Sequence, residues 1–174
     1  MKTITFVPFS DFKSIQLGVL ESFRGEIIEV NCTFPRNISH VQRIIMVENA
    51  FKESALKESC DFYVYNQADI KHITGFENID LMQNFLIKHL DFGAVALCRQ
   101  KFSDEFPLVY DPILGSHICS GCVMFTRRGL EAVCFDLDNG YRSTCYSIGK
   151  SLSDAGLKYG YLDNKKRVEH LGGK

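Results

Sequence analysis

A short polar tip follows a buried-looking strand in the stretch CDFYVYNQADIKH, residues 60–72. The mostly apolar residues Phe62 to Tyr65 run directly into Gln67, Ala68 and Asp69. Open α/β sheets bind their ligands outside the carboxyl ends of their strands. We therefore expect Asp69 to stand at a ligand-binding edge. The alternative is a polar strand end that binds nothing.

Histidine and basic side chains elsewhere could reach the same edge. His72 follows Asp69 by three positions, and His40 stands where a helix is expected to begin. A histidine of this kind is more often a surface or capping residue. Arginine suits a diphosphate because its guanidinium forms bidentate hydrogen bonds. Arg127 and Arg128, or the basic run 165–167, are therefore candidate phosphate contacts or simply solvated charges.

The chain contains seven cysteines, and two of them form a CSGC motif at 119–122. This spacing is half of a structural zinc site, but the sequence holds no second CxxC. A redox CxxC usually opens a helix, whereas the residues VMF that follow this motif are typical of a strand. We interpret the cysteines as reduced and mostly buried thiols, as in proteins of the cytosol.

Length and charge exclude several classes of protein. The 174 residues suit one domain with an ordinary core. The formal net charge is −1 and the only short basic run is NKKR at 164–167, so we expect no nucleic-acid partner. No apolar run is long enough for a signal peptide or a transmembrane segment. We expect a soluble, cytoplasmic protein.

The apolar periodicity predicts strands that alternate with helices. The expected strands are 3–9, 26–34, 61–66, 92–100 and 157–162, with a further strand that turns into a helix over 119–133. The other expected helices are 11–25, 40–59, 78–90 and 141–156, the second capped by Ser39 and the last stopped by Gly156. Residues 101–118 read as a long loop, which in a compact domain is often functional. Successive strand–helix–strand units favour a parallel sheet.

This order of elements resembles the nucleotide-sugar glycosyltransferases of the GT-A fold, especially the family-2-like inverting group. The likeness covers nearly the whole chain and lies in the layout and in partial motifs. It implies one α/β domain over residues 1–174, with a Rossmann-like, mostly parallel sheet flanked by helices. It also implies a nucleotide-diphospho-sugar donor and an acceptor that the sequence does not identify.

The resemblance assigns nucleoside contacts to the ends of the first two strands. In that family the first strand ends near a proline and the second ends in an acidic or amide residue that contacts the base. Pro8, Phe9 and Asn31 stand at those places. Arg43 is the nearest match to an Arg-Asn pair near the start of the next helix.

The resemblance also implies a metal site. The family's third strand leads to Asp-x-Asp, where this chain has Gln67-Ala68-Asp69, and a late histidine of the family is matched by His170. Mn²⁺ or Mg²⁺ takes oxygen ligands and stabilises charge on the departing diphosphate as a Lewis acid. We expect Asp69 and His170 to hold such an ion weakly. Gln67 keeps an oxygen but lacks the charge, and its alternative role is a hydrogen bond to ribose or phosphate.

The acceptor side matches the family less well. Ser120 and Gly121 resemble a Ser-Gly-Gly turn that lies beside the acceptor. Inverting transfer needs a carboxylate base, but the segment RSTCYSIG carries no acid where the family has an acidic pair. Asp136 and Asp138 are substitutes only if their loop folds back; otherwise they are solvated acids or a helix cap.

Three functions remain open at this point. The first is a glycosyltransferase, and the second is a binding or regulatory module of the same fold whose chemistry has lapsed. An acid from segment 136–147 that points toward Asp69 would favour the enzyme. The third is another nucleotide-binding α/β protein, but the sequence has no P-loop and no GxGxxG after a strand.

Overall fold

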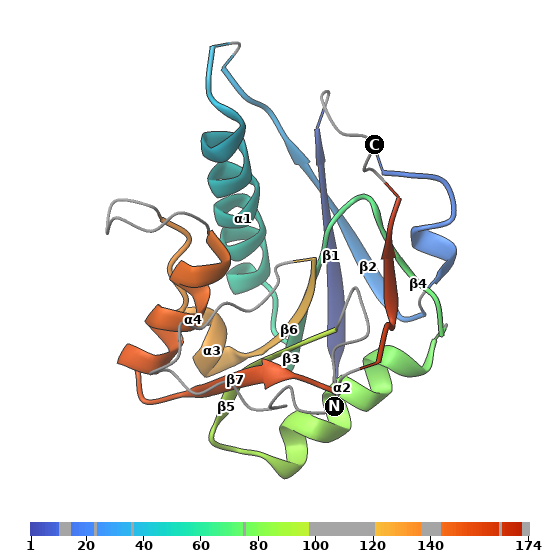
Figure 1. Ribbon diagram of the computed structural model, residues 1–174, viewed down its shortest axis with the longest axis vertical. Coiled ribbons are helices and arrows are strands. Elements are labelled where there is room, and N and C mark those ends of the chain that lie inside the picture. The colour runs from blue at the N-terminus through green and yellow to red at the C-terminus, as the bar shows by residue number, and fades with distance from the viewer. Residues whose placement is uncertain are drawn as a thin grey trace.

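A six-stranded sheet with strand order β2-β1-β3-β6-β5-β7 forms the centre of the computed structural model (Figure 1). The described residues are 1–10, 15–22, 24–35, 37–74, 76–97, 121–136, 144–163 and 165–171. The strands are β1 (Thr3–Ser10), β2 (Glu26–Cys32), β3 (Phe62–Asn66), β5 (Phe92–Ala96), β6 (Cys122–Thr126) and β7 (Lys158–Tyr161). β6 runs antiparallel to its neighbours β3 and β5, whereas the other pairs are parallel. The mostly parallel α/β sheet predicted from the sequence is confirmed.

A second, two-stranded sheet joins the segment after β3 to the end of the chain. Its strands, β4 (Ile70–His72) and β8 (Val168–His170), pair antiparallel, with Ile70 opposite His170. Neither strand can be recognised in the sequence, because three residues are too few to show an alternating pattern.

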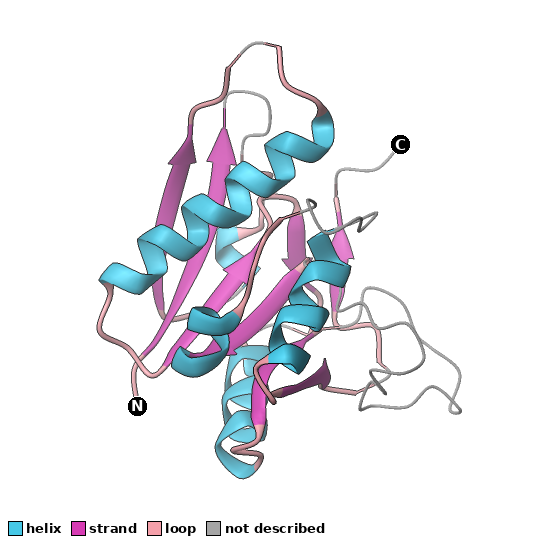
Figure 2. Ribbon diagram, turned by 90° about the vertical axis from the view of Figure 1, so that its left-hand side faces the viewer, coloured by secondary structure: helices cyan, strands magenta, loops and turns pink. Residues whose placement is uncertain are grey.

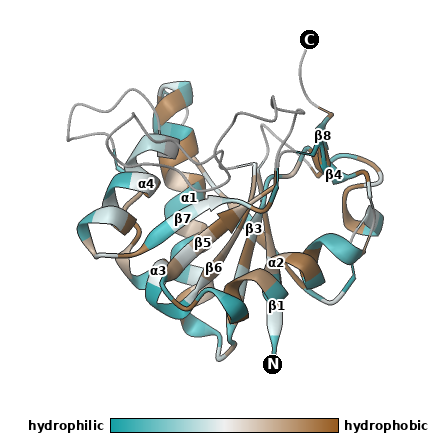
Figure 3. Ribbon diagram, turned by 60° about the horizontal axis from the view of Figure 1, so that its bottom comes forward, coloured by the Kyte–Doolittle hydropathy of each residue, from teal (hydrophilic) through white to brown (hydrophobic). Residues whose placement is uncertain are grey.

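Helices cover both faces of the six-stranded sheet (Figure 2). One face packs against α1 (His40–Lys57), α3 (Arg127–Ala132) and α4 (Thr144–Asp154), and the other against α2 (Glu77–Lys88). Tyr63 and Tyr65 of β3 face α1, whereas Phe62 and Val64 face α2. Both faces are covered, so all five positions of β3 and all five of β5 are buried rather than alternately buried and exposed. Figure 3 shows brown, hydrophobic segments in the strands of this sheet.

The predicted helix boundaries agree with the local chemistry at two ends. Ser39 caps α1 through a capping box, in which its hydroxyl accepts from Gln42 N and the Gln42 side chain accepts from Ser39 N. Gly156 follows α4 with a φ of +71°, a conformation that glycine adopts without strain.

The helix predicted over 11–25 is wrong for the residues that the structure describes there. Its described part contains only a 3₁₀ turn, η1 (Leu20–Ser22), and residues 11–14 and 23 lie outside the described ranges. Gly18 has a φ of +81°, which no α-helix accommodates. Gln16 N donates to Ala68 O at 2.7 Å instead of to a helical carbonyl. The loop expected at 101–118 lies outside the described residues.

Helix α3 lies directly on strand β5. A Cβ atom on Gly129 would stand 1.9 Å from the carbonyl oxygen of Gly93, so only glycine fits at this crossing. Within the described ranges, no helix has the length and apolar character needed to cross a membrane.

Candidate functional site

A tight turn carries Asp69 at the carboxyl end of β3. Ile70 N donates to Gln67 O at 3.0 Å and so closes a four-residue turn in which Asp69 is the third residue. Gln67 N donates to Gly121 O at 2.9 Å, which ties the turn to the start of β6. Asp69 therefore lies at the sheet edge where the sequence predicted it.

The β4–β8 pairing brings His170 to this turn. Leu171 N donates to Asp69 O at 2.8 Å, and Nε2 of His170 lies 2.8 Å from Oδ2 of Asp69. The side chain of Asp69 is 1% exposed and that of His170 is 34% exposed. The carboxylate and the imidazole, expected together on the resemblance alone, are in direct contact, and the imidazole is the part open to solvent.

The candidate nucleoside contacts lie on neighbouring strands. Phe9 and Asn31 occupy paired positions of the parallel strands β1 and β2, close to the carboxyl ends of both. Phe9 is partly buried and Asn31 is exposed, whereas Pro8 is buried inside β1. Phe9 and Asn31 are thus available to a ligand at this edge in a way that Pro8 is not.

Arg43 lies in the first turns of α1, the helix that follows β2. Its guanidinium donates to Ile38 O at 3.3 Å, just before the helix. Gly121 is buried, and its carbonyl supports the Asp69 turn. Ser120, its predicted partner on the acceptor side, lies outside the described residues.

Asp136 follows α3 on the face of the sheet that α1 covers. Its backbone N–H donates to Ser147 Oγ at 3.5 Å, and the preceding residue, Phe135, belongs to the core on the α1 side. Ala68 and Ile70, which flank Asp69, pack into the core on the α2 side. Asp138, the second candidate base, lies outside the described residues.

A set of buried polar side chains lies behind the Asp69 turn. Their contact with one another is not evident from the sequence. We call this set the buried polar network, and its members are Asn66, His72, Asn78 and Arg167. Asn66 Nδ2 donates to Ile70 O at 2.9 Å, and His72 Nε2 lies 3.1 Å from Asn66 Oδ1. Burial lowers the pKa of the His72 imidazole to about 4, so this ring is neutral at pH 7.

The network continues from His72 to the residue before β8. Asn78 Nδ2 lies 3.4 Å from His72 Nδ1 and donates to Arg167 O at 3.3 Å. Arg167 Nη1 donates to Asn78 Oδ1 at 3.2 Å, and Arg167 Nε donates to Asp163 Oδ2 at 2.9 Å. The sequence points to His72 and, through the basic run 165–167, to Arg167, but not to Asn66 or Asn78. An amide at the end of an apolar strand, as in FYVYN, is a further signal for Asn66.

Two of the remaining basic candidates, Arg127 and Arg167, are held in contacts away from the Asp69–His170 pair. His40 is exposed at the first position of α1. Arg127 donates to Glu131 Oε1 at 2.7 Å and to the hydroxyl of Tyr63 at 2.8 Å, at the opposite edge of the sheet from Asp69. Arg167 is buried in the network rather than solvated.

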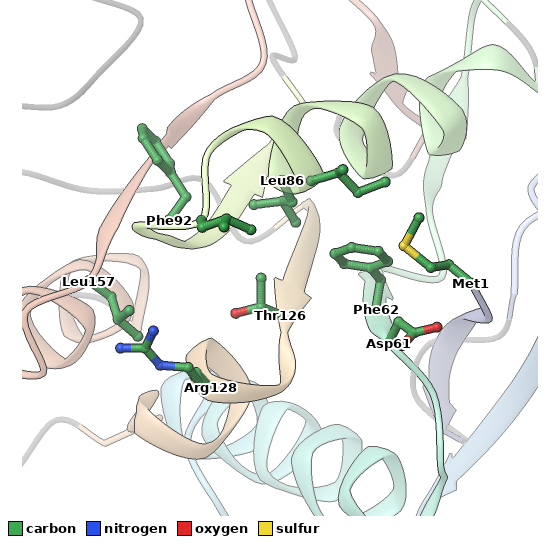
Figure 4. Close-up of a pocket in the computed structure, with 10 residues that line it drawn as sticks. Met1, Asp61, Phe62, Leu86, Phe92, Thr126, Arg128 and Leu157 are labelled. Carbon is green, nitrogen blue, oxygen red and sulfur yellow. The ribbon is translucent and has the colours of Figure 1, made fainter.

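A pocket of about 490 Å³ also lies at that opposite edge (Figure 4). Phe62, Leu86, Phe92 and Leu157 form its apolar walls, with Arg128 at one side. Since it is built at the amino ends of β3 and β5, it is separate from the Asp69–His170 pair.

No protein-family model matches the sequence, and no curated protein gives a significant sequence match. Solved structures do match. The mannosyltransferase PcManGT of Pyrobaculum calidifontis, in complex with GDP-Man and Mn²⁺, superposes with a TM-score of 0.67 at 12% identity, over 99% of this chain and 57% of that chain.

Two further structures match at similar levels. A glycosyltransferase involved in the glycosylation of the major capsid of PBCV-1 gives a TM-score of 0.59 at 11% identity, over 98% of this chain and 95% of that one. Glucosyl-3-phosphoglycerate synthase of Mycobacterium tuberculosis, in complex with Mn²⁺, UDP-Glc and phosphoglyceric acid, gives a TM-score of 0.58 at 14% identity. The match covers 99% of this chain and 73% of that chain. The chain spans little more than half of the mannosyltransferase but nearly all of the PBCV-1 protein. The protein therefore has the fold of the GT-A glycosyltransferases.

Proposed function

We propose that the protein binds a nucleotide-diphospho-sugar at the carboxyl edge of its sheet and transfers the sugar to an acceptor. The observation that carries the proposal is the 2.8 Å contact between Asp69 Oδ2 and His170 Nε2 at the end of β3. Solved structures of the same fold contain GDP-Man or UDP-Glc together with Mn²⁺. In an open sheet of this kind, the carboxyl edge is the general place for a nucleotide.

The donor set fits a weakly held divalent ion. A carboxylate and an imidazole are both ligands of Mn²⁺, but the described residues include no group of three or more His, Cys, Asp or Glu side chains that could hold a metal. An ion at Asp69 and His170 would thus depend on phosphate oxygens and water for its other ligands, as Mg²⁺ does in many nucleotide sites. When bound there, the ion would supply Lewis-acid stabilisation of the leaving diphosphate.

The nucleoside would lie over β1 and β2. Phe9 offers an aromatic ring for the base, and Asn31 offers an exposed amide that can both donate and accept hydrogen bonds. Gln67 stands two positions before Asp69 and keeps the oxygen needed to bond ribose or phosphate. Arg43, at the start of α1, is the further cation proposed for this edge.

The binding-module alternative also has an observation in its favour. Within the described ranges, no third acid or histidine joins Asp69 and His170. Asp136 follows α3 on the α1 side of the sheet, and Gln67 replaces a carboxylate. A protein that binds the donor without consuming it would have this composition.

Thermal-shift measurements with UDP-, GDP-, CDP- and dTDP-sugars, each with and without Mn²⁺, test the proposal. A ligand at a hundred times its Kd stabilises the folded state by about 2.7 kcal/mol, which is readily measured. We expect one nucleotide class to raise the Tm, and Mn²⁺ to increase that rise. The absence of any shift with every nucleotide and metal would refute donor binding.

Donor consumption separates the enzyme from the binding module. We expect release of nucleoside diphosphate from the sugar-nucleotide that raises the Tm, either to water or to an added acceptor. Asp69→Asn should abolish the release, whereas Asp61→Asn, the same chemical change at the opposite edge, should not. Binding without release for every acceptor tested would favour the module.

A further inference from the structure

The buried polar network lies directly behind the proposed site and takes part in none of the proposed chemistry. Its four members are almost completely buried, with exposed fractions of 0% for Asn66, 3% for His72, 0% for Asn78 and 8% for Arg167. We infer that the network is a positioning device that holds Asp69 against His170. Its consequence for ligand binding rests on the proposed function, but the contact that it maintains does not.

Asn66 holds the Asp69 turn from beneath. Its Nδ2 donates to Gln67 O at 3.0 Å and to Ile70 O at 2.9 Å, the first and last residues of that turn. The side-chain amide therefore fixes the backbone on both sides of Asp69. Removal of this amide would leave two carbonyls at the turn without these bonds, in a place that water reaches poorly.

The orientation of each polar group follows from its neighbour. Because both hydrogens of Asn66 Nδ2 are used on the turn, its Oδ1 faces His72 and accepts from Nε2. His72 Nδ1 then has its lone pair toward Asn78 Nδ2. A neutral imidazole with the proton on Nε2 satisfies both side-chain amides, and an imidazolium does not. The thiol of Cys122, 3.5 Å from Nε2, is a weaker neighbour of the same ring.

Asn78 and Arg167 connect the network to the C-terminal strand β8. Asn78 Nδ2 donates to Arg167 O, which also accepts from Ile73 N at 2.9 Å. The Asn78 Oδ1 atom accepts from Arg167 Nη1 at 3.2 Å and from Thr74 Oγ1 at 2.7 Å. The residue immediately before β8 is thereby fixed to the segment around the start of α2.

The β4–β8 pairing that the network supports is short. β4 and β8 share three residue pairs, with Ile70 opposite His170 and His72 opposite Val168. A slip of one residue would turn His170 to the other face of the small sheet. Burial of Ile70 and Val168 in the core on the α2 side disfavours such a slip. Directional hydrogen bonds to the backbone before β8 add a second restraint that also fixes where the strand begins.

Two variants of His72 distinguish positioning from packing. His72→Phe keeps a flat ring of similar size but offers no hydrogen bond to Asn66 or Asn78. His72→Gln keeps both a hydrogen-bond donor group and an acceptor, the amide NH2 and the carbonyl oxygen, but has a different shape. If the network positions the site, the glutamine variant should resemble the wild type and the phenylalanine variant should not; packing alone predicts the reverse order.

Amide hydrogen exchange of the full chain measures, without any ligand, how firmly the Asp69 turn and β8 are held. The reporters are the amides of Ile70, Ile73 and Leu171, whose acceptors lie in the turn or before β8. In His72→Phe we expect these amides to exchange roughly tenfold faster, while the amide of Val64 in β3 changes much less. The control Thr126→Ala removes the side-chain cap of α3 at the opposite edge. It should leave the exchange rates of the reporter amides, relative to that of the Val64 amide, as in the wild type.

The outcomes are distinct from those of the donor-binding test. Unchanged reporter exchange in His72→Phe, or an equal increase at Val64, would overturn the inference. If the wild type binds no nucleotide, the proposed function fails, but the exchange ratios still decide the positioning. If the wild type binds nucleotide, His72→Phe should weaken Mn²⁺-dependent binding at least about tenfold and leave metal-free nucleotide binding within about twofold. Equal losses of metal-dependent and metal-free binding would also overturn the inference.

Discussion

His170 meets Asp69 because β8 pairs with the three residues that leave the Asp69 turn. The Nε2–Oδ2 distance of 2.8 Å joins a side chain from the end of the chain to one from its middle, at the carboxyl end of the central strand β3. The carboxylate is buried and the imidazole is partly open, so a ligand would approach through the histidine.

Asp69→Asn tests the charge at the site. The amide keeps one oxygen and nearly the same volume but removes the negative charge, so we expect the Mn²⁺-dependent part of donor binding to fall at least about tenfold. Isothermal titration with the sugar-nucleotide, with and without Mn²⁺, measures it. Asp61→Asn is the matched control; equal losses in both variants would mean that the effect is not local to the site.

Phe9 and Asn31 test the nucleoside position. Base–aromatic stacking is worth about 1–3 kcal/mol per base. Phe9→Leu keeps an apolar side chain without the ring, so it should weaken the binding of every nucleotide. Asn31→Ala removes one or more hydrogen bonds and should change the order of preference among bases, at about 1 kcal/mol for each bond. Dissociation constants for UDP, GDP, CDP and dTDP give both results. If neither variant binds nucleotides more weakly, the nucleoside does not lie over β1 and β2.

His72 should make stability depend on pH. Burial lowers its pKa in the folded state from 6.5 to about 4, so the unfolded chain binds the proton more readily. The free energy of unfolding attributable to His72 is therefore fully present above pH 6.5 and is lost as the pH falls toward 4, by about 3 kcal/mol in total. Urea unfolding at pH 7.5, 6, 5 and 4.5 measures this loss.

His72→Gln is the control for that pH dependence, because its side chain does not titrate. Carboxylates that protonate in the same range contribute equally to the wild type and the variant. The difference between the two curves isolates the histidine. Parallel curves between pH 7.5 and 4.5 would contradict the assigned burial of a neutral imidazole.

The six strands of the central sheet could be predicted because their signal is local, whereas their order and the antiparallel direction of β6 could not. Runs such as FYVYN and FGAVA are apolar at successive positions, and Ser39 and Gly156 mark helix ends with side-chain and backbone chemistry that the sequence displays. The helix expected at 11–25 failed because its apolar spacing was read without Gly18, whose positive φ turns the chain. There, tertiary hydrogen bonds such as Gln16 N to Ala68 O replace helical ones.

The contact between Asp69 and His170 could be predicted only in part. The position of Asp69 at the sheet edge follows from its place after an apolar strand, whereas the position of His170 beside it follows only from a resemblance in layout. The strands that bring them together have three residues each and show no pattern. The network behind them consists of Asn, His and Arg side chains whose partners lie far along the chain, such as Asn78 and Arg167, and residue type alone does not reveal such pairs.

Gly129→Ala tests the crossing of α3 over β5. The added Cβ would stand 1.9 Å from Gly93 O, a backbone atom that no side-chain rotation can move away, so α3 must shift from the sheet. Helix propensity favours alanine by up to about 1 kcal/mol, but overpacking against backbone costs about 1–3 kcal/mol or more. We expect a net loss of stability, measured by urea unfolding. Arg128→Ala, an exposed change in the same helix, should remain within about 0.5 kcal/mol of the wild type; a Gly129→Ala protein as stable as this control would show that α3 does not rest on the β5 backbone.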